Sequence, residues 1–171
     1  MSDSRPVTPY IADLIQAINM ANNLTATTSI TINVPLSKAW QALIDPAMIK
    51  EYLFGTNAKS DWEKGSSITY SGEWEGKAYT DKGTIIEIVP DKRLHTTYLS
   101  GNSGKEDRPE NYANVIYELD PEDGQTRVTV TQDNIDNEEQ LDHMKKNWSM
   151  VLSSMKKLLE KDQPPLSIAS P

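Results

Sequence analysis

The sequence predicts an α+β domain, in which an antiparallel sheet of about six or seven strands wraps around one long C-terminal helix. Two observations support this class. Short segments of alternating apolar and polar residues, separated by turn residues, fill the middle of the chain. A long amphipathic stretch follows them, over about residues 138–161. The 171 residues suffice for one such domain with a core of its own.

The two ends of the chain differ from this central part. Residues 1–25 are predicted to form an N-terminal arm followed by an amphipathic helix over 9–21, for which Thr8 is a candidate cap. Its apolar stripe consists of Ile11, Leu14, Ile15 and Ile18. Residues 26–161 form the predicted domain, and residues 162–171 form a proline-rich tail that cannot continue a helix.

The domain opens with a strand and two short helices. Alternation over residues 30–34 predicts a half-buried strand, which Pro35 ends. Ser37 is a candidate cap for the first short helix, and the Asp45–Pro46 pair is typical of the start of a second. The apolar residues of these helices are Trp40, Leu43, Ile44, Met48, Ile49, Tyr52 and Leu53.

The central strands are recognised by the turns between them. Glu75–Gly76–Lys77 is a candidate hairpin turn, and Pro90–Asp91–Lys92 and Pro121–Gly124 are further turns. Residues 100–111 are predicted to form a long polar loop. The segments between these turns alternate apolar and polar residues, which predicts an antiparallel meander.

The final helix carries apolar residues at steps of three and four. They are Leu141, Met144, Trp148, Val151 or Leu152, Met155, Leu158 and Leu159. Glu138 and Glu139 lie at its start and lysines at its end, as the helix dipole favours. We expect its apolar face to lie on the concave side of the sheet.

Composition excludes several classes of function. The net charge of −8 and a pI near 4.8 disfavour nucleic acid and anionic membrane surfaces as partners. Without cysteine, the chain has no disulfide and no thiolate, and its two histidines are a poor basis for a metal site. No apolar run approaches a membrane span, and the first residues lack the features of a secretion signal. We therefore expect a cytoplasmic protein without metal, cofactor, nucleic acid or membrane.

Several local motifs resemble one known family. They are Val34 to Leu43 followed by Asp45–Pro46, then Trp62-Glu63-Lys64-Gly65, Gly72-Glu73-Trp74, Lys82-Gly83 and Pro90-Asp91-Lys92-Arg93-Leu94. Over about residues 26–161 the chain resembles the activator of heat-shock-protein-90 ATPase homologues (AHSA-type domains) of the helix-grip, START-like (SRPBCC) superfamily. The resemblance implies a cavity between the sheet and the last helix, where many superfamily members bind apolar molecules. It also implies that some members are enzymes and that others bind partner proteins, including a co-chaperone linked to the stress response.

The candidate site residues are large side chains expected on inward faces, together with one carboxylate. The expected pocket wall consists of Trp40, Tyr52, Phe54, Trp74, Glu87, Tyr98, Tyr117, Met144 and Trp148. For any one aromatic residue or methionine, ordinary core packing is the simpler interpretation. Taken together, apolar walls with tyrosine hydroxyls at their tips are typical of a ligand pocket. Glu87 lies among isoleucines and valine, so the sequence leaves open which side it faces.

Three hypotheses about function follow. The first is a non-catalytic binding domain with an internal cavity for an apolar or amphipathic small molecule. The second is a co-chaperone-like module whose sheet surface and acidic edges contact a protein partner. Separately, the N-terminal helix is expected either to cover the domain or to mediate a homodimer. The third is an enzyme of the cyclase or dehydratase kind, with Tyr98, Glu87 or His95 as acid or base. We assign no catalytic residue on the sequence alone.

Overall fold

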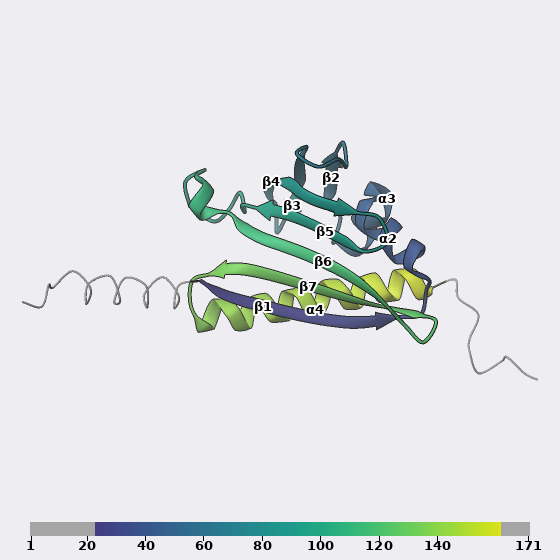
Figure 1. The fold of residues 1–171 in the computed structure, drawn as a ribbon. Helices are drawn as coiled ribbons and strands as arrows, with labels where there is room; N and C mark the ends of the chain where they lie inside the picture. Colours follow the sequence, from purple (N-terminus) through teal and green to yellow (C-terminus); the bar gives the residue numbers. More distant parts are fainter. Residues whose placement is uncertain (1–22, 162–171) are drawn as a thin grey trace, which may run out of the picture.

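The computed structural model describes residues 23–161 and shows an α+β fold (Figure 1). Seven strands form one antiparallel sheet in the order β1-β7-β6-β5-β4-β3-β2. The elements are β1 (Leu24–Ile32), α2 (Leu36–Ile44), α3 (Pro46–Tyr52), β2 (Asn57–Ser60), β3 (Ser67–Trp74), β4 (Lys77–Val89), β5 (Arg93–Tyr98), the 3-10 turn η1 (Pro109–Asn111), β6 (Ala113–Glu122), β7 (Gln125–Ile135) and α4 (Glu138–Glu160). The predicted class is confirmed, whereas the N-terminal helix over 9–21 and the tail lie outside the described residues.

The sheet is a meander from β2 to β7, and β1 joins it at the free edge of β7. The β3–β4 hairpin turns through Glu75 and Gly76, whose φ angles of 51° and 79° are both positive. Asp123 and Gly124 have the same signs, at 51° and 82°, between β6 and β7. A two-residue turn with two positive φ angles matches the twist of the strands it joins. Both turns were predicted, whereas the short strand β2 was not.

The two short helices begin in different ways. Asp45 caps α3 as predicted, since its Oδ1 accepts a hydrogen bond of 2.9 Å from the Ala47 N–H and Pro46 occupies the first turn. Helix α2 begins two residues earlier than a Ser37 cap would allow. Its cap is Pro35, which has no side-chain hydrogen bond to offer, and the Pro35 carbonyl accepts from Lys38 and Ala39. The helix therefore starts directly after Pro35, whereas β1 already ends at Ile32, before the proline that was predicted to end it.

Helix α4 lies along the β1 and β7 side of the sheet (Figure 1) and makes most of its contacts with β1. Its C-terminal half is buried through Val151, Leu152, Met155 and Leu159. Its N-terminal half is different, because Leu141, Met144 and Trp148 are only partly buried. The helix thus seals the core at one end and leaves its own apolar face partly uncovered at the other. Within residues 23–161, the helices lack the combination of length and hydropathy that a bilayer-spanning segment requires.

The C-terminal end of α4 is held to the end of β1 by an ionic contact. Glu160 Oε2 accepts hydrogen bonds from the Asn33 N–H at 2.8 Å and from Lys156 Nζ at 2.7 Å. Lys156 Nζ also donates to the Thr31 carbonyl at 2.8 Å. Both side chains therefore satisfy backbone groups where β1 leaves the sheet.

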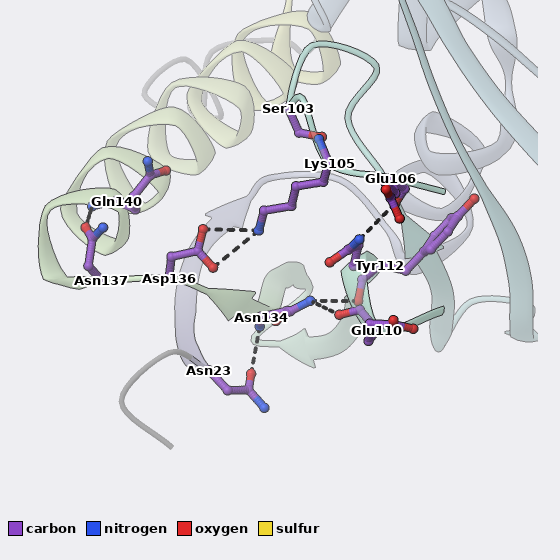
Figure 2. Close-up of polar contacts among 11 residues, drawn as sticks. Asn23, Ser103, Lys105, Glu106, Glu110, Tyr112, Asn134, Asp136, Asn137 and Gln140 are labelled. Carbon is purple, nitrogen blue, oxygen red and sulfur yellow. Dashed lines mark hydrogen bonds and ion pairs between the residues drawn. The ribbon is translucent and has the colours of Figure 1, made fainter. Parts of the chain in front are cut away.

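The start of α4 is held by polar contacts with the loop between β5 and β6 (Figure 2). Asn137 caps the helix by accepting from the Gln140 N–H at 2.9 Å, and Lys105 of the loop pairs with Asp136 at 3.1 Å. Asn134 Nδ2 donates to the carbonyls of Glu110 and Tyr112, at 3.0 and 3.1 Å. The predicted polar loop is thus fixed beside the partly uncovered half of α4.

Candidate functional site

Four tyrosines from separate elements meet inside the fold. Tyr52 comes from α3, Tyr70 from β3, Tyr98 from β5 and Tyr117 from β6. Burial raises the pKa of all four phenols, and the other three phenols raise that of Tyr117 further. All four belong to one hydrophobic cluster, in which Tyr52 and Tyr117 are buried and Tyr70 and Tyr98 pack against the buried residues. We call these four residues the tyrosine cluster.

The four hydroxyls divide into two pairs by their hydrogen bonds. Tyr52 donates to the Ala42 carbonyl at 2.8 Å, and Tyr98 donates to Asp81 Oδ2 at 2.7 Å. Among the described residues, the hydroxyls of Tyr70 and Tyr117 have no such partner, and because no fully enclosed side-chain oxygen lacks one, both hydroxyl oxygens retain some accessible surface. These two hydroxyls are therefore the members of the cluster that a bound molecule can engage.

Asp81 belongs to the site because of strand register. It lies directly opposite Tyr70 in the β3–β4 pair, and opposed residues share one face of a sheet. Its Oδ2 accepts from Tyr98, and its Oδ1 accepts from the Gly101 N–H at 2.9 Å. Both carboxylate oxygens are thus occupied on the inner side. The second bond also fixes the start of the loop that reaches α4 through Lys105.

Trp148 closes the site from the helix side. Its ring packs edge-to-face on Tyr117, with centroids 5.8 Å apart and planes at 86°. Its indole N–H donates to Gln132 Oε1 at 2.9 Å, and the Gln132 side chain on β7 is buried. Met144 lies one turn earlier on the same helix face, and it is partly buried. The N-terminal half of α4 therefore faces an aromatic wall tipped with polar groups.

The residues expected in the pocket wall fall into three groups. Tyr52, Tyr98, Tyr117, Met144 and Trp148 lie at the site described above, and Trp40 is a buried core residue. Trp74 is 61 % exposed beside the β3–β4 turn, and Phe54 is 52 % exposed after α3. Glu87 lies opposite His95 on β5. The residues on either side of His95, Leu94 and Thr96, are buried on the inner face of the sheet, so His95 faces the other side.

Glu87 is therefore on the outer face of the sheet. There Arg93 joins it to Glu118, at 3.0 and 3.2 Å. Its neighbours in sequence are apolar because β4 has a register shift between Ile85 and Glu87, which breaks the simple alternation. The three residues named as possible acids or bases therefore lie on opposite faces of the sheet. Tyr98 faces inward, whereas His95 and Glu87 share the outer face.

Three residues of the site were missed on the sequence. Tyr70 alternates with Ile68, a pattern that favours an inner face but does not distinguish a site residue from a core residue. Gln132 and Asp81 carry no such signal, because a polar residue in a strand is expected to face solvent. Only the register and the position of α4 bring them inside.

Two shallow depressions lie on the surface. One, of about 390 Å³, is lined by Phe54, Ser149, Met150 and Ser153. The other, of about 450 Å³, lies on the outer face of β3 to β5, where Lys82 pairs with Asp107 and Tyr112 donates to the same carboxylate at 2.6 Å. In the part of the chain from Asn23 to Lys161, no three histidine or carboxylate side chains are placed to hold a metal ion.

The curved antiparallel sheet, the pair of short helices after β1 and the long C-terminal helix define a helix-grip domain. The family model described as "Activator of Hsp90 ATPase homolog 1-like protein" matches residues 33–160, so the chain belongs to this family. No curated protein matches the chain.

Solved structures agree with this assignment. ChR145 from Cytophaga hutchinsonii is 43 % identical, with a TM-score of 0.71, over 81 % of this chain and 94 % of that one. A Mesorhizobium loti protein is 21 % identical with a TM-score of 0.69, over 82 % of this chain and 100 % of that one. The Aha1 dimer from Colwellia psychrerythraea is 19 % identical with a TM-score of 0.65, over 82 % and 99 %. The last two show a shared fold.

Proposed function

We propose that this protein is a binding domain that holds an apolar or amphipathic small molecule between the tyrosine cluster and the N-terminal half of α4. One observation carries the proposal. Apolar side chains of α4 that face the cluster, Met144 and Trp148, are only partly buried, whereas the same face is buried from Val151 onward. A molecule inserted there would cover the exposed apolar area and gain about 25 cal/mol per Å², before the costs of ordering.

The polar groups of the site favour an amphipathic ligand over a purely apolar one. The hydroxyls of Tyr70 and Tyr117 can each donate one hydrogen bond and also accept. The Gln132 side chain adds an amide beside Trp148. A few polar groups within apolar walls are what orients a ligand in a pocket. We therefore infer binding of an amphipathic molecule as the activity of this site.

The neutral dye N-phenyl-1-naphthylamine tests the proposal through thermal unfolding of the full chain. A ligand that binds the native state at 100 times its Kd stabilises it by about 2.7 kcal/mol, which raises Tm by several degrees. Met144→Trp fills the proposed space and is expected to remove this shift. Met150→Trp is the matched control, because Met150 is 55 % exposed on the same helix.

Two results would count against an interior site. If Met150→Trp alone removes the shift, the dye binds in the surface depression beside Phe54. If the wild-type chain shows no shift, and native mass spectrometry of freshly purified protein finds no retained molecule, the binding function is contradicted.

A second candidate function is association with a second copy of the chain. Phe54 and Met150 are 52 % and 55 % exposed and line one depression, and an exposed apolar pair of this kind is a common part of an interface. Phe54 also has a φ of 54°, a left-handed backbone conformation that is costly for a residue other than glycine. Light scattering of the wild type and of Phe54→Ser/Met150→Ser tests it. A dimer that the double substitution dissociates supports it, and a monomeric wild type at high concentration excludes it.

A further inference from the structure

We propose that the interior site selects uncharged ligands and rejects molecules that carry an anionic group, such as free fatty acids, and that Asp81 enforces this selection. The inference rests on the proposed function, and it adds to it the chemical class of the ligand. Its basis is the distribution of charge around the tyrosine cluster.

Among the described residues, the cations nearest the inner side of the sheet are already paired or face away from it, and Lys105, beside the start of α4, is paired with Asp136. Within residues 23–161, every lysine and arginine side chain is exposed except those of Arg93 and Lys156. Arg93 lies on the outer face with Glu87 and Glu118, and Lys156 is engaged with Glu160 at the far end of α4. His95 faces outward with Asn114, and His143 is exposed.

The charged group that does adjoin the cluster is negative. Asp81 accepts hydrogen bonds on both of its oxygens from Tyr98 and Gly101, which is how an ionised carboxylate is satisfied. Burial, followed by the charge of Asp81, raises the pKa of Tyr98, so that phenol remains a neutral donor. An anion placed among these groups loses its hydration, meets a like charge and finds no positive partner.

A neutral ligand avoids each of these penalties. The hydroxyls of Tyr70 and Tyr117 can donate to, or accept from, an alcohol, ketone or phenol group. Hydrogen bonds of this kind offset the desolvation free energy of a neutral polar group. They do not offset the much larger desolvation free energy of a charged group. The site therefore discriminates by the charge of the ligand's polar end.

Two dyes that differ only in a sulfonate group provide the test. N-phenyl-1-naphthylamine is neutral, and 1-anilinonaphthalene-8-sulfonate is its anionic counterpart. Fluorescence titrations of the full chain should be run in 0.5 M NaCl. At this ionic strength the Debye length is a few Å, so the net charge of −8 does not by itself repel the sulfonate dye from a distance. We expect the sulfonate to bind at least about tenfold more weakly than the neutral dye.

Substitutions then assign the effect. Asp81→Asn is expected to reduce the ratio of the two dissociation constants, sulfonate over neutral dye, at least about threefold. Asp107→Asn removes the same formal charge on the outer face, where Asp107 pairs with Lys82, and is expected to leave the difference unchanged. If Asp81→Asn does not fold, the wild-type comparison still tests the selection.

The outcomes separate this inference from the proposed function. Equal affinity for the two dyes overturns the charge selection and leaves a small-molecule site standing. A difference that Asp81→Asn does not alter, or that Asp107→Asn alters equally, overturns the role of Asp81. Binding of neither dye overturns the proposed function and the selection with it.

Discussion

The Trp148 indole N–H on α4 donates a hydrogen bond of 2.9 Å to the side-chain oxygen of Gln132 on β7. The same ring packs edge-to-face on Tyr117 of the neighbouring strand. One side chain thus fixes the partly uncovered half of the helix to the inner face of the sheet through both a polar and an aromatic contact. This position is expected to be sensitive to small chemical changes.

Trp148→Phe is expected to lower the free energy of unfolding by about 1–3 kcal/mol. The substitution keeps a ring against Tyr117 but leaves the buried Gln132 oxygen without its donor. Urea denaturation of the two proteins measures the difference. The double variant Trp148→Phe/Gln132→Met should recover part of the loss, because it removes both hydrogen-bonding partners. Additive losses in the double variant would show that the hydrogen bond contributes little.

Glu160→Gln is expected to destabilise the protein at neutral pH and to have little effect in acid. Partial burial raises the pKa of Glu160, but hydrogen bonds from Lys156 and Asn33 outweigh it, so the net pKa is lowered. A lowered carboxyl pKa contributes stability above the unfolded pKa of about 4.3, and this stability is lost as pH falls through the folded pKa. We expect a difference of about 1–2 kcal/mol at pH 7, which shrinks below pH 4.

Denaturant unfolding between pH 3 and pH 7 checks this expectation. Glu63→Gln is a suitable control, since Glu63 is exposed in the loop before β3. Its carboxylate forms no ion pair with a described residue, and its hydrogen bonds to Ser66 involve only its backbone. A Glu160→Gln effect that is constant over this pH range would contradict the ionic explanation.

Gly83→Ala is expected to cost more than about 3 kcal/mol or to prevent folding. A Cβ atom at Gly83 would lie 1.8 Å from the Thr97 carbonyl oxygen, and this oxygen belongs to the backbone of β5. Gly76→Ala is the matched control. Gly76 has a φ of +79° but open space around it, so its substitution should cost only about 1 kcal/mol. Similar Tm values for the two variants would argue against close backbone packing at Gly83.

Removal of residues 1–22 tests the predicted amphipathic helix over 9–21. Its apolar stripe is expected to be buried, either on this domain or against a second copy, so the shortened chain should lose stability or change its oligomeric state. The deletion should keep Asn23, because Asn23 Oδ1 accepts from the Asn134 N–H. Thermal unfolding and light scattering give the readout. A truncated chain that is equally stable and has the same mass in solution would refute the helix's role.

Much of the fold could be predicted because its signals are local. The turns at Glu75–Gly76 and Asp123–Gly124 need positive φ angles that few residues adopt, and the Asp45 cap acts on a backbone group two residues away. The amphipathic period of α4 was predicted over 138–161, and the helix ends at Glu160. Strand β2 escaped prediction, because its four residues, Asn-Ala-Lys-Ser, carry no apolar alternation and owe their strand form to pairing with β3.

The candidate site was only partly accessible to the same reasoning. Periodicity predicts inward faces for Tyr98, Tyr117 and Trp148, and these side chains lie in the core or pack against it. Trp74 follows the same alternation as Tyr70 and is nevertheless exposed. Trp74 is the last residue of its strand, where the hairpin extends beyond the part of the sheet that covers the core. Periodicity assigns a face to a side chain, but it does not reveal where that face ceases to be covered.

The sequence by itself determined the order of the elements, the inner faces of most strands and the absence of thiol chemistry, because each depends on residue type and on neighbours a few positions away. Tertiary structure decided the rest. The β3–β4 register sets Asp81 opposite Tyr70, and the position of α4 brings Trp148 to Gln132. These pairings depend on how distant segments pack together. The local sequence around a polar residue does not indicate whether the fold will supply a buried hydrogen-bond partner for it.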